Sequence, residues 1–171
     1  MPGRPPLRHT AAWLLLSLAA VTACGNGPGP VAVDPPRIAA GGMAAVCDRL
    51  ATALPAKVDD LHRRRTDPAA TTVAAWGDPP VVLRCGVGPP AGLTATSQLS
   101  GVNEVDWYVD EQPTQRVWTT FARAADVEVT IPNSHSPAVG PVVDLATAIK
   151  ATDPKVTPPH LQVSASQTPS P

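Results

Sequence analysis

The stretch Val81-Val-Leu-Arg-Cys-Gly-Val87 decides the fold class of this 171-residue chain. Every second residue in it is apolar or a cysteine, so an extended strand here would bury one face and expose the other. The stretch Val127-Glu-Val-Thr-Ile131 alternates in the same way, with Glu128 and Thr130 facing outward. This pattern is typical of an antiparallel sheet that is covered on one face only.

Two shorter runs, 105–109 and 117–122, extend the strand pattern. Trp107 and Tyr108 are expected to point to opposite faces, so that one is buried and the other is exposed. Residues 42–54 have apolar side chains at helical spacing and are followed by Pro55, and Pro141 can begin a closing helix. The predicted fold is α+β, with a small antiparallel sheet of about four strands flanked by an N-terminal and a C-terminal helix.

Residues 58–70 carry Arg63-Arg-Arg65 among the acids Asp59, Asp60 and Asp67. The composition predicts a solvated stretch or a short helix that leads into a loop. A basic cluster of this kind could contact anionic lipid or an anionic wall polymer. The flanking acids favour the simpler interpretation of a solvated charged face.

Changes of composition divide the chain into four parts. Residues 1–23 are predicted to be a lipoprotein signal peptide, because Arg4 and Arg8 precede an uncharged apolar run that is shorter than the ~20 residues of a spanning helix. Residues 24–38 are predicted to be a lipidated tether, since Gly and Pro are too dense between 25 and 37 for a regular element. One globular domain is expected over 39–151. The Pro/Ser/Thr-rich segment 152–171 is expected to be a disordered tail.

Val21-Thr-Ala-Cys24 resembles the bacterial lipobox, in which the cysteine thiol receives diacylglycerol before the signal peptide is cut. We therefore expect Cys24 to be the lipidation site. The chain would then be lipid-anchored at the extracytoplasmic face of the cell membrane. The alternative is a soluble secreted protein with a spare thiol.

Two further cysteines, Cys47 and Cys85, remain for the domain. Outside the cytoplasm thiols oxidise readily, so we expect a Cys47–Cys85 disulfide that joins the first helix to the first strand. A metal pair or a catalytic thiol is the competing interpretation, and either would require a neighbouring His or further Cys that the sequence does not place nearby.

The charge balance argues against a nucleic-acid partner. Residues 1–23 hold two of the 13 basic residues and none of the 14 acidic ones, which leaves the rest of the chain with a net charge near −3. Such a chain has no basic stripe to neutralise phosphates along a nucleic acid.

Several motifs together resemble a known family. Trp76-Gly-Asp-Pro, Leu83-Arg-Cys-Gly-Val87, Val105-Asp-Trp107 and the segment 121–132 are similar to an uncharacterised family of actinobacterial membrane lipoproteins, a domain of unknown function. The resemblance covers roughly residues 46–150. It implies a location at the membrane and a folded unit, but no activity. Ten Arg against three Lys, with abundant Ala and Pro, agrees with a GC-rich genome. Glu104 departs from the pattern, because the similar proteins tend to have Gly there, in a tight turn before the strand.

Four residues are candidates for ligand or partner contact: Trp76, Asp78, Arg84 and Tyr108. Trp76 offers a large face and Asp78 an acceptor within a Gly/Pro turn, with Arg84 a few residues on. The structural alternative is that Trp76 packs over the sheet, Asp78 caps a turn and Arg84 pairs with an acid. An exposed Tyr108 could mark a partner surface.

The inventory of catalytic groups is poor. Neither a Gly-x-Ser-x-Gly nor a His-Glu-x-x-His motif nor a phosphate loop is present, and Asp106 and Asp110 share an outward strand face, where solvated carboxylates are ordinary. We expect no catalytic residue, metal or cofactor, and a non-catalytic binding or accessory module of the envelope, with an envelope protein or wall polymer as partner. A small envelope hydrolase with an unrecognised site is the alternative.

Overall fold

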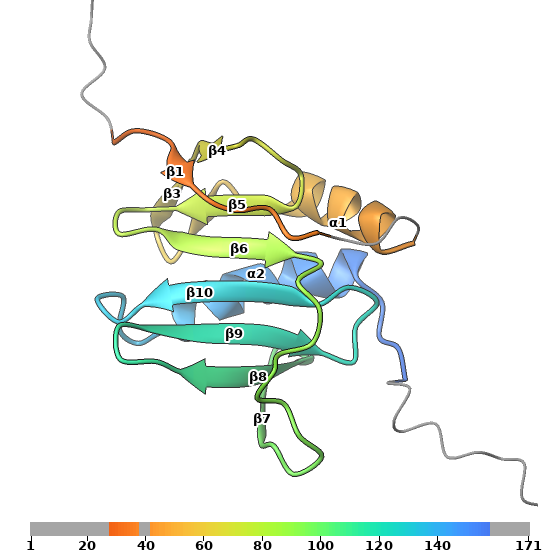
Figure 1. Ribbon diagram of the computed structural model, residues 1–171. Helices are drawn as coiled ribbons and strands as arrows, with labels where there is room; N and C mark the ends of the chain where they lie inside the picture. Colours follow the sequence, from red (N-terminus) through yellow and green to blue (C-terminus); the bar gives the residue numbers. More distant parts are fainter. Residues whose placement is uncertain (1–27, 38–41, 158–171) are drawn as a thin grey trace, which may run out of the picture.

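The computed structural model describes residues 28–37 and 42–157. These residues form an antiparallel eight-stranded sheet in the order β2-β3-β5-β6-β10-β9-β8-β7, with two helices packed on one face (Figure 1). The prediction of an α+β fold with an antiparallel sheet is confirmed. The predicted size of about four strands is wrong, because the sheet extends beyond the alternating runs at both sides.

The alternating runs form the middle of this sheet. They are β6 (Val81–Cys85), β8 (Val105–Glu111), β9 (Gln115–Phe121) and β10 (Val127–Pro132). In β10 the residues Val127, Val129 and Ile131 are fully buried on the helix side. The prediction that Glu128 and Thr130 face outward is also confirmed, since both are only half-buried on the opposite face.

Four strands of the eight-stranded sheet were not predicted from the sequence: β2 (Lys57–Val58), β3 (Leu61–Arg64), β5 (Val73–Trp76) and β7 (Leu99–Val102). β5 is buried on both faces, so it shows no alternation, and its two alanines have low strand propensity. β7 is an edge strand with exposed Ser and Gly. The stretch 58–70, predicted to be solvated or helical, therefore contains strands instead, including β4 (Thr66–Asp67).

The N-terminal segment also contributes structure. β1 (Val31–Ala32) pairs in parallel with β4, and Val31 N–H donates to Arg65 O at 2.9 Å. Val31 and Val33 pack with Val73 and Ala75 in a small apolar cluster on the sheet face opposite the helices. The expectation that no regular element forms between residues 25 and 37 was wrong for this strand.

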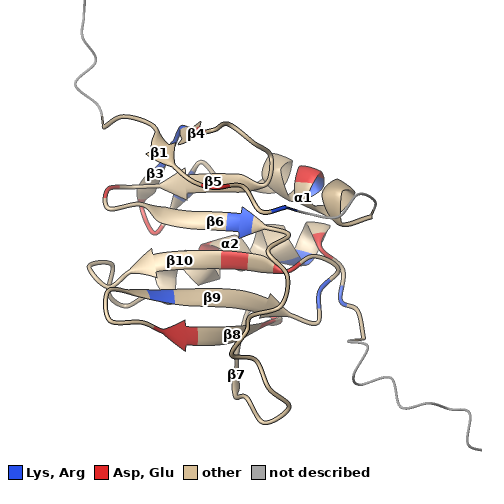
Figure 2. Ribbon diagram, viewed as in Figure 1, with Lys and Arg blue, Asp and Glu red and all other residues tan. Residues whose placement is uncertain are grey.

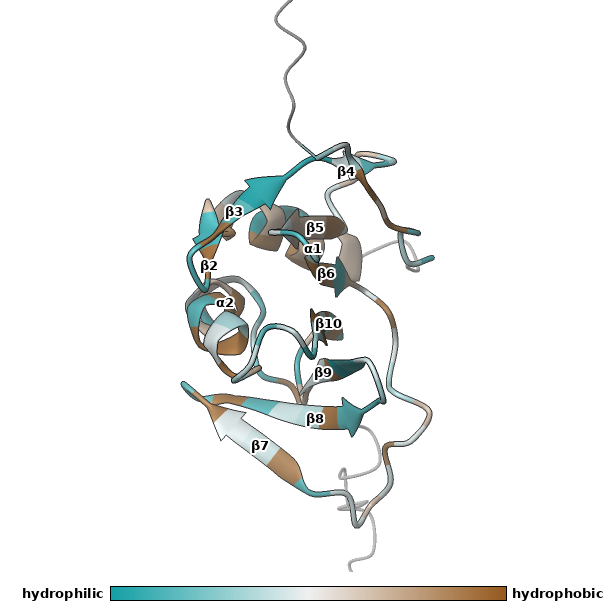
Figure 3. Cartoon of the chain, turned by 90° about the vertical axis from the view of Figure 1, so that its left-hand side faces the viewer, coloured by the Kyte–Doolittle hydropathy of each residue, from teal (hydrophilic) through white to brown (hydrophobic). Residues whose placement is uncertain are grey.

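The helices α1 (Gly42–Ala53) and α2 (Gly140–Thr152) lie side by side on the other face of the sheet (Figures 1 and 3). Both match their predicted positions, and Pro141 lies in the first turn of α2 as expected. The main core lies between the helices and the sheet, where Leu50, Leu145 and Ile149 are buried beside Trp107. Neither helix of the described residues is long and apolar enough to cross a membrane.

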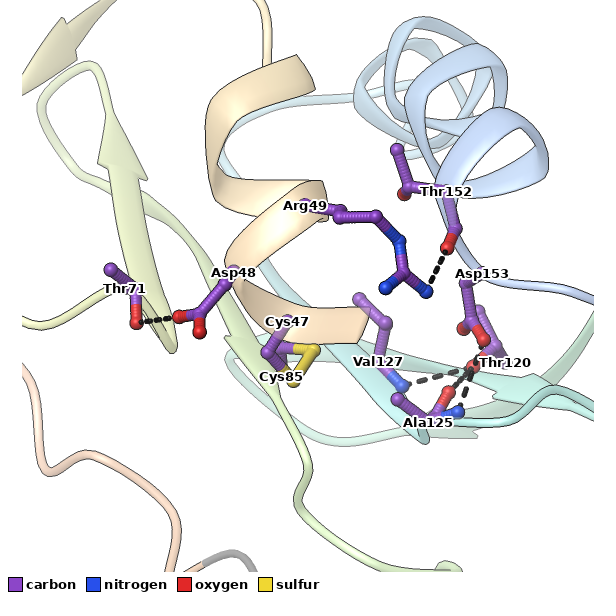
Figure 4. The surroundings of a disulfide bond; sticks show 10 residues. All are labelled: Cys47, Asp48, Arg49, Thr71, Cys85, Thr120, Ala125, Val127, Thr152 and Asp153. Carbon is purple, nitrogen blue, oxygen red and sulfur yellow. Dashed lines mark hydrogen bonds between the residues drawn. A yellow bond between two sulfur atoms is a disulfide. The ribbon is translucent and has the colours of Figure 1, made fainter. Parts of the chain in front are cut away.

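The Cys47–Cys85 disulfide joins α1 to β6, as predicted (Figure 4). Both cysteines are buried in the main core. The bond therefore ties the first helix to the middle of the sheet, across 38 residues of sequence.

The chain after α2 remains packed for several residues. Asp153 is fully buried, and its Oδ1 accepts a hydrogen bond from Ala125 N–H at 3.1 Å (Figure 4). Arg123 donates to the backbone carbonyl of Asp153 at 2.8 Å. Burial raises the pKa of Asp153 to about 6, although these contacts act in the opposite direction. The assignment of residue 153 to a disordered tail was therefore wrong, whereas residues 158–171 lie outside the described part.

Candidate functional site

The sheet face opposite the helices carries a continuous row of polar side chains. The register pairs Arg84 of β6 with Glu128 of β10, Glu128 with Thr119 of β9, and Thr119 with Tyr108 of β8. Cross-strand partners project from the same face of a sheet. Arg84 and Tyr108, two of the predicted candidates, are thereby placed at the two ends of one row.

A second row runs beside the first, near the end of β8 and the start of β9. Thr130 pairs with Val117, and Val117 pairs with Asp110. Gln112 Nε2 donates to Asp110 Oδ2 at 2.8 Å, and Gln115 Nε2 donates to Gln112 Oε1 at 2.8 Å. The two glutamines and the aspartate thus form a hydrogen-bonded chain at one end of the face.

The connection between β6 and β7 crosses this face of the sheet (Figures 1 and 3). Pro90, Ala91 and Gly92 form one wall of a cavity of about 440 Å³, and the two polar rows form its floor. Gly92 lies so close to Tyr108 that a Cβ at this position would overlap the tyrosine hydroxyl. A larger residue here would therefore force the Tyr108 hydroxyl to shift. We call this cavity the outer groove.

The outer groove is lined by one basic side chain, Arg84, and two acidic ones, Asp110 and Glu128, so its formal net charge is −1. Arg84 Nη1 and Glu128 Oε1 are 3.2 Å apart, and about a third of the Arg84 side chain and a fifth of the Glu128 side chain are exposed. Arg84 Nε is buried and has no hydrogen-bond partner among the described residues. Charged positions of both signs occur on the strands around the groove (Figure 2). The groove thus combines donors and acceptors with little net charge.

Trp76 lies on the opposite side of the sheet from the outer groove. Its side chain is fully buried on the helix side of β5, and its Nε1 donates to Pro55 O at 3.1 Å. The Arg63 guanidinium lies 5.0 Å from the centre of its ring, and burial lowers the pKa of this arginine. This placement gives Trp76 a packing role and no solvent-facing surface.

Asp78 lies in the turn between β5 and β6 and is largely exposed. Its Oδ1 is 3.6 Å from Arg64 Nη1, and it borders a hollow near the N-terminal segment. The structure therefore separates the Trp76-Gly-Asp-Pro motif from Arg84. The four candidates do not form a single site.

The sequence pattern did not reveal most of the outer groove. Glu128 and Thr130 were predicted to face outward, but Gln112, Gln115 and Thr119 carried no signal. Their meeting depends on the strand order, in which β10 lies between β6 and β9 although it follows both in the chain. In the described residues no group of three or more His, Cys, Asp or Glu side chains is arranged to hold a metal ion.

These features define a small disulfide-bonded α+β domain with one helix-covered face and one polar, grooved face. Residues 9–158 match a protein family that is described as a protein of unknown function, DUF3515. The chain belongs to this family. No curated protein and no solved structure matches the chain significantly.

Proposed function

We propose that this chain is the precursor of an actinobacterial envelope lipoprotein whose mature domain is a non-catalytic binding module. The outer groove is the ligand site, and the lipid on Cys24 holds the domain at the extracytoplasmic face of the membrane. The observation that carries the ligand site is the row from Arg84 to Tyr108 beneath the Pro90–Gly92 wall. Cys24 itself lies outside the described residues.

The ligand that best fits this groove is a neutral, hydroxyl-rich wall polymer. The groove offers carboxylates, amides, hydroxyls and one guanidinium, so it can both donate to and accept from the same ligand group. Sugar hydroxyls have this dual character. Tyr108 and Pro90 add apolar surface against which a sugar ring can pack.

The anchor is tested by fractionation of cells that express the full chain. We expect the wild-type protein in the membrane fraction, with an N-terminal diacylglyceryl cysteine detected by mass spectrometry. Cys24→Ala should move the protein to the soluble fraction. Detection of an unmodified Cys24 in the membrane-bound protein would refute the anchor.

The ligand site is tested by calorimetric titration of the mature protein with the uncharged fraction of the soluble glycan fragments that a muramidase releases from cell walls. Tyr108→Phe should weaken binding about 2- to 10-fold, because it removes one hydroxyl contact. Gly92→Ala should weaken it by at least about tenfold, because the added Cβ must displace the tyrosine.

Gly101→Ala is the matched control, since a Cβ there meets only an ordinary contact at 3.8 Å. Equal affinities for Gly92→Ala and Gly101→Ala would exclude the groove as the site. Chromatography of the fragments after incubation tests the alternative function. Shortened fragments that the wild-type protein produces and Tyr108→Phe does not would favour a hydrolase over a binding module.

A further inference from the structure

Arg63, Arg64 and Arg65, which we call the arginine edge, lie beside the N-terminal segment of the domain. Arg64 Nη2 donates to Gly29 O at 2.5 Å, and its Nη1 donates to Gly77 O at 2.8 Å. The hydrogen bond from Val31 N–H to Arg65 O adds a second connection. The central arginine is therefore engaged in holding the N-terminal segment against the sheet.

The two outer arginines are differently placed. Arg63 and Arg65 are exposed, and neither forms an ion pair within the described residues. Both border a shallow hollow of about 700 Å³, together with Thr66 and the single acidic side chain Asp67. Beyond Leu61, the strand that carries Arg63 is hydrophilic (Figure 3). Both arginines therefore offer guanidinium N–H groups to an anion outside the protein, Arg63 only from the side that does not face the Trp76 ring 5.0 Å away.

The length of chain between Cys24 and Gly29 limits where this anion can lie. Four residues lie between Cys24 and Gly29, and the five Cα–Cα steps from one to the other span at most about 18 Å when fully extended. Because Arg64 is hydrogen-bonded to Gly29, a lipid on Cys24 would keep the Arg64 guanidinium, at the centre of the arginine edge, within about 20 Å of the bilayer surface. This step rests on the lipid anchor proposed above.

We propose that Arg63 and Arg65 bind the phosphate groups of anionic phospholipids in the outer leaflet and so orient the domain on the membrane. Guanidinium groups match phosphate oxygens in geometry and charge. Each arginine near an anionic surface shifts a contact equilibrium only about fivefold, so two of them bind weakly from solution. The short tether supplies the high effective concentration that makes this contact dominant.

The contact is tested by arginine-specific labelling with phenylglyoxal, read out residue by residue by mass spectrometry. The lipidated mature protein is reconstituted into phosphatidylcholine vesicles, with or without about one third phosphatidylglycerol. Labelling of Arg63 and Arg65 should be at least about threefold slower on the anionic vesicles, as expected for a contact of this strength. The difference should vanish at about 0.5 M salt, where charges are strongly screened.

Arg116 is the internal control, because it lies on β9 and is partly exposed. Equal labelling of Arg63 and Arg65 on both vesicle types would overturn the proposal, and so would an equal slowing of Arg116. The unanchored Cys24→Ala chain should show no protection. Protection of that chain to the same extent would refute the role of the tether. A wild-type protein that does not float with neutral vesicles would refute the anchor itself, which is a separable outcome.

Discussion

At the residue scale, Glu104 occupies a conformation that is unfavourable for its type. It forms the two-residue turn between β7 and β8 with Asn103, and both residues have positive φ, at +67° and +47°. Such turns prefer Asn-Gly, and a side chain with a Cβ costs about 1–2 kcal/mol in this region. The tight turn therefore exists despite the departure at Glu104. The exposed ion pair between Glu104 and Lys150, at 3.2 Å, offsets little of this conformational cost.

Glu104→Gly should consequently stabilise the protein by about 0.5–1 kcal/mol, because the backbone strain disappears while a weak surface pair is lost. Chemical denaturation measures the free energy of unfolding. Glu104→Ala is the control, since it loses the same ion pair but keeps the Cβ. If the glycine variant is no more stable than the alanine variant, the strain at this turn is not as described.

Asp153 should make the stability depend on pH. Its pKa in the folded state is raised to about 6, so between about pH 4 and 6 the folded protein binds a proton that the unfolded chain has released. The free energy of unfolding should therefore fall as the pH rises through this window, by roughly 2–3 kcal/mol in total from this group. Asp153→Asn should flatten the profile measured by denaturation at several pH values.

Burial is the cause of the raised pKa of Asp153, which agrees with a free energy of unfolding that falls as the pH rises. Burial also raises the pKa of the neighbouring Asp126, so some slope of the same sign should persist in the Asp153 variant. A wild-type protein that becomes more stable from pH 4 to 7 would contradict the assignment.

At the scale of elements, alternation predicted the strands that bury one face only. Both helices were found because their apolar spacing and prolines are local signals. β5 was missed because β1 covers its outer face, so the partner that makes it apolar lies about 40 residues away in the chain. β1 was missed because its Gly/Pro-rich surroundings are typical of a tether, and only a few valines distinguish it.

Val31→Pro should detach β1 from the domain, because it removes the N–H that donates to Arg65 and also a buried side chain. The neighbouring Val33 N–H, bonded to Asp67 O at 3.1 Å, should then exchange with solvent at least about tenfold faster. Amide hydrogen exchange resolves this position. Ala32→Pro, at an exposed strand residue, should retain most of the protection. Equal exchange in both variants would show that the strand pairing is unimportant.

At the scale of the whole molecule, the sequence predicted the disulfide and the fold class but not the site. Cys47 and Cys85 could be paired by counting, because a third cysteine was assigned to the lipobox. The outer groove could not be predicted, because Arg84 and Tyr108 meet only through the strand order and a loop that folds back over the sheet.

Replacing both core cysteines, Cys47→Ala with Cys85→Ala, should lower the free energy of unfolding by about 4 kcal/mol, as expected for releasing a loop of this length in the unfolded chain. Urea denaturation of the double variant measures this loss. Reduction of the wild-type protein should produce a similar decrease, which serves as the matched control. An unchanged midpoint in both experiments would mean that the bond does not constrain the unfolded state.

Under the proposed membrane contact, the strand order would also determine how high the outer groove stands above the bilayer. β3 and the strands β10 and β9 of the groove floor are three and four positions apart in the sheet, and neighbouring strands are about 4.8 Å apart. With the arginine edge at the headgroups, the sheet acts as a rigid spacer that lifts the groove about 15–20 Å from them. A ligand bound there would be held away from the bilayer, so the domain could bind a polymer strand without drawing it toward the membrane.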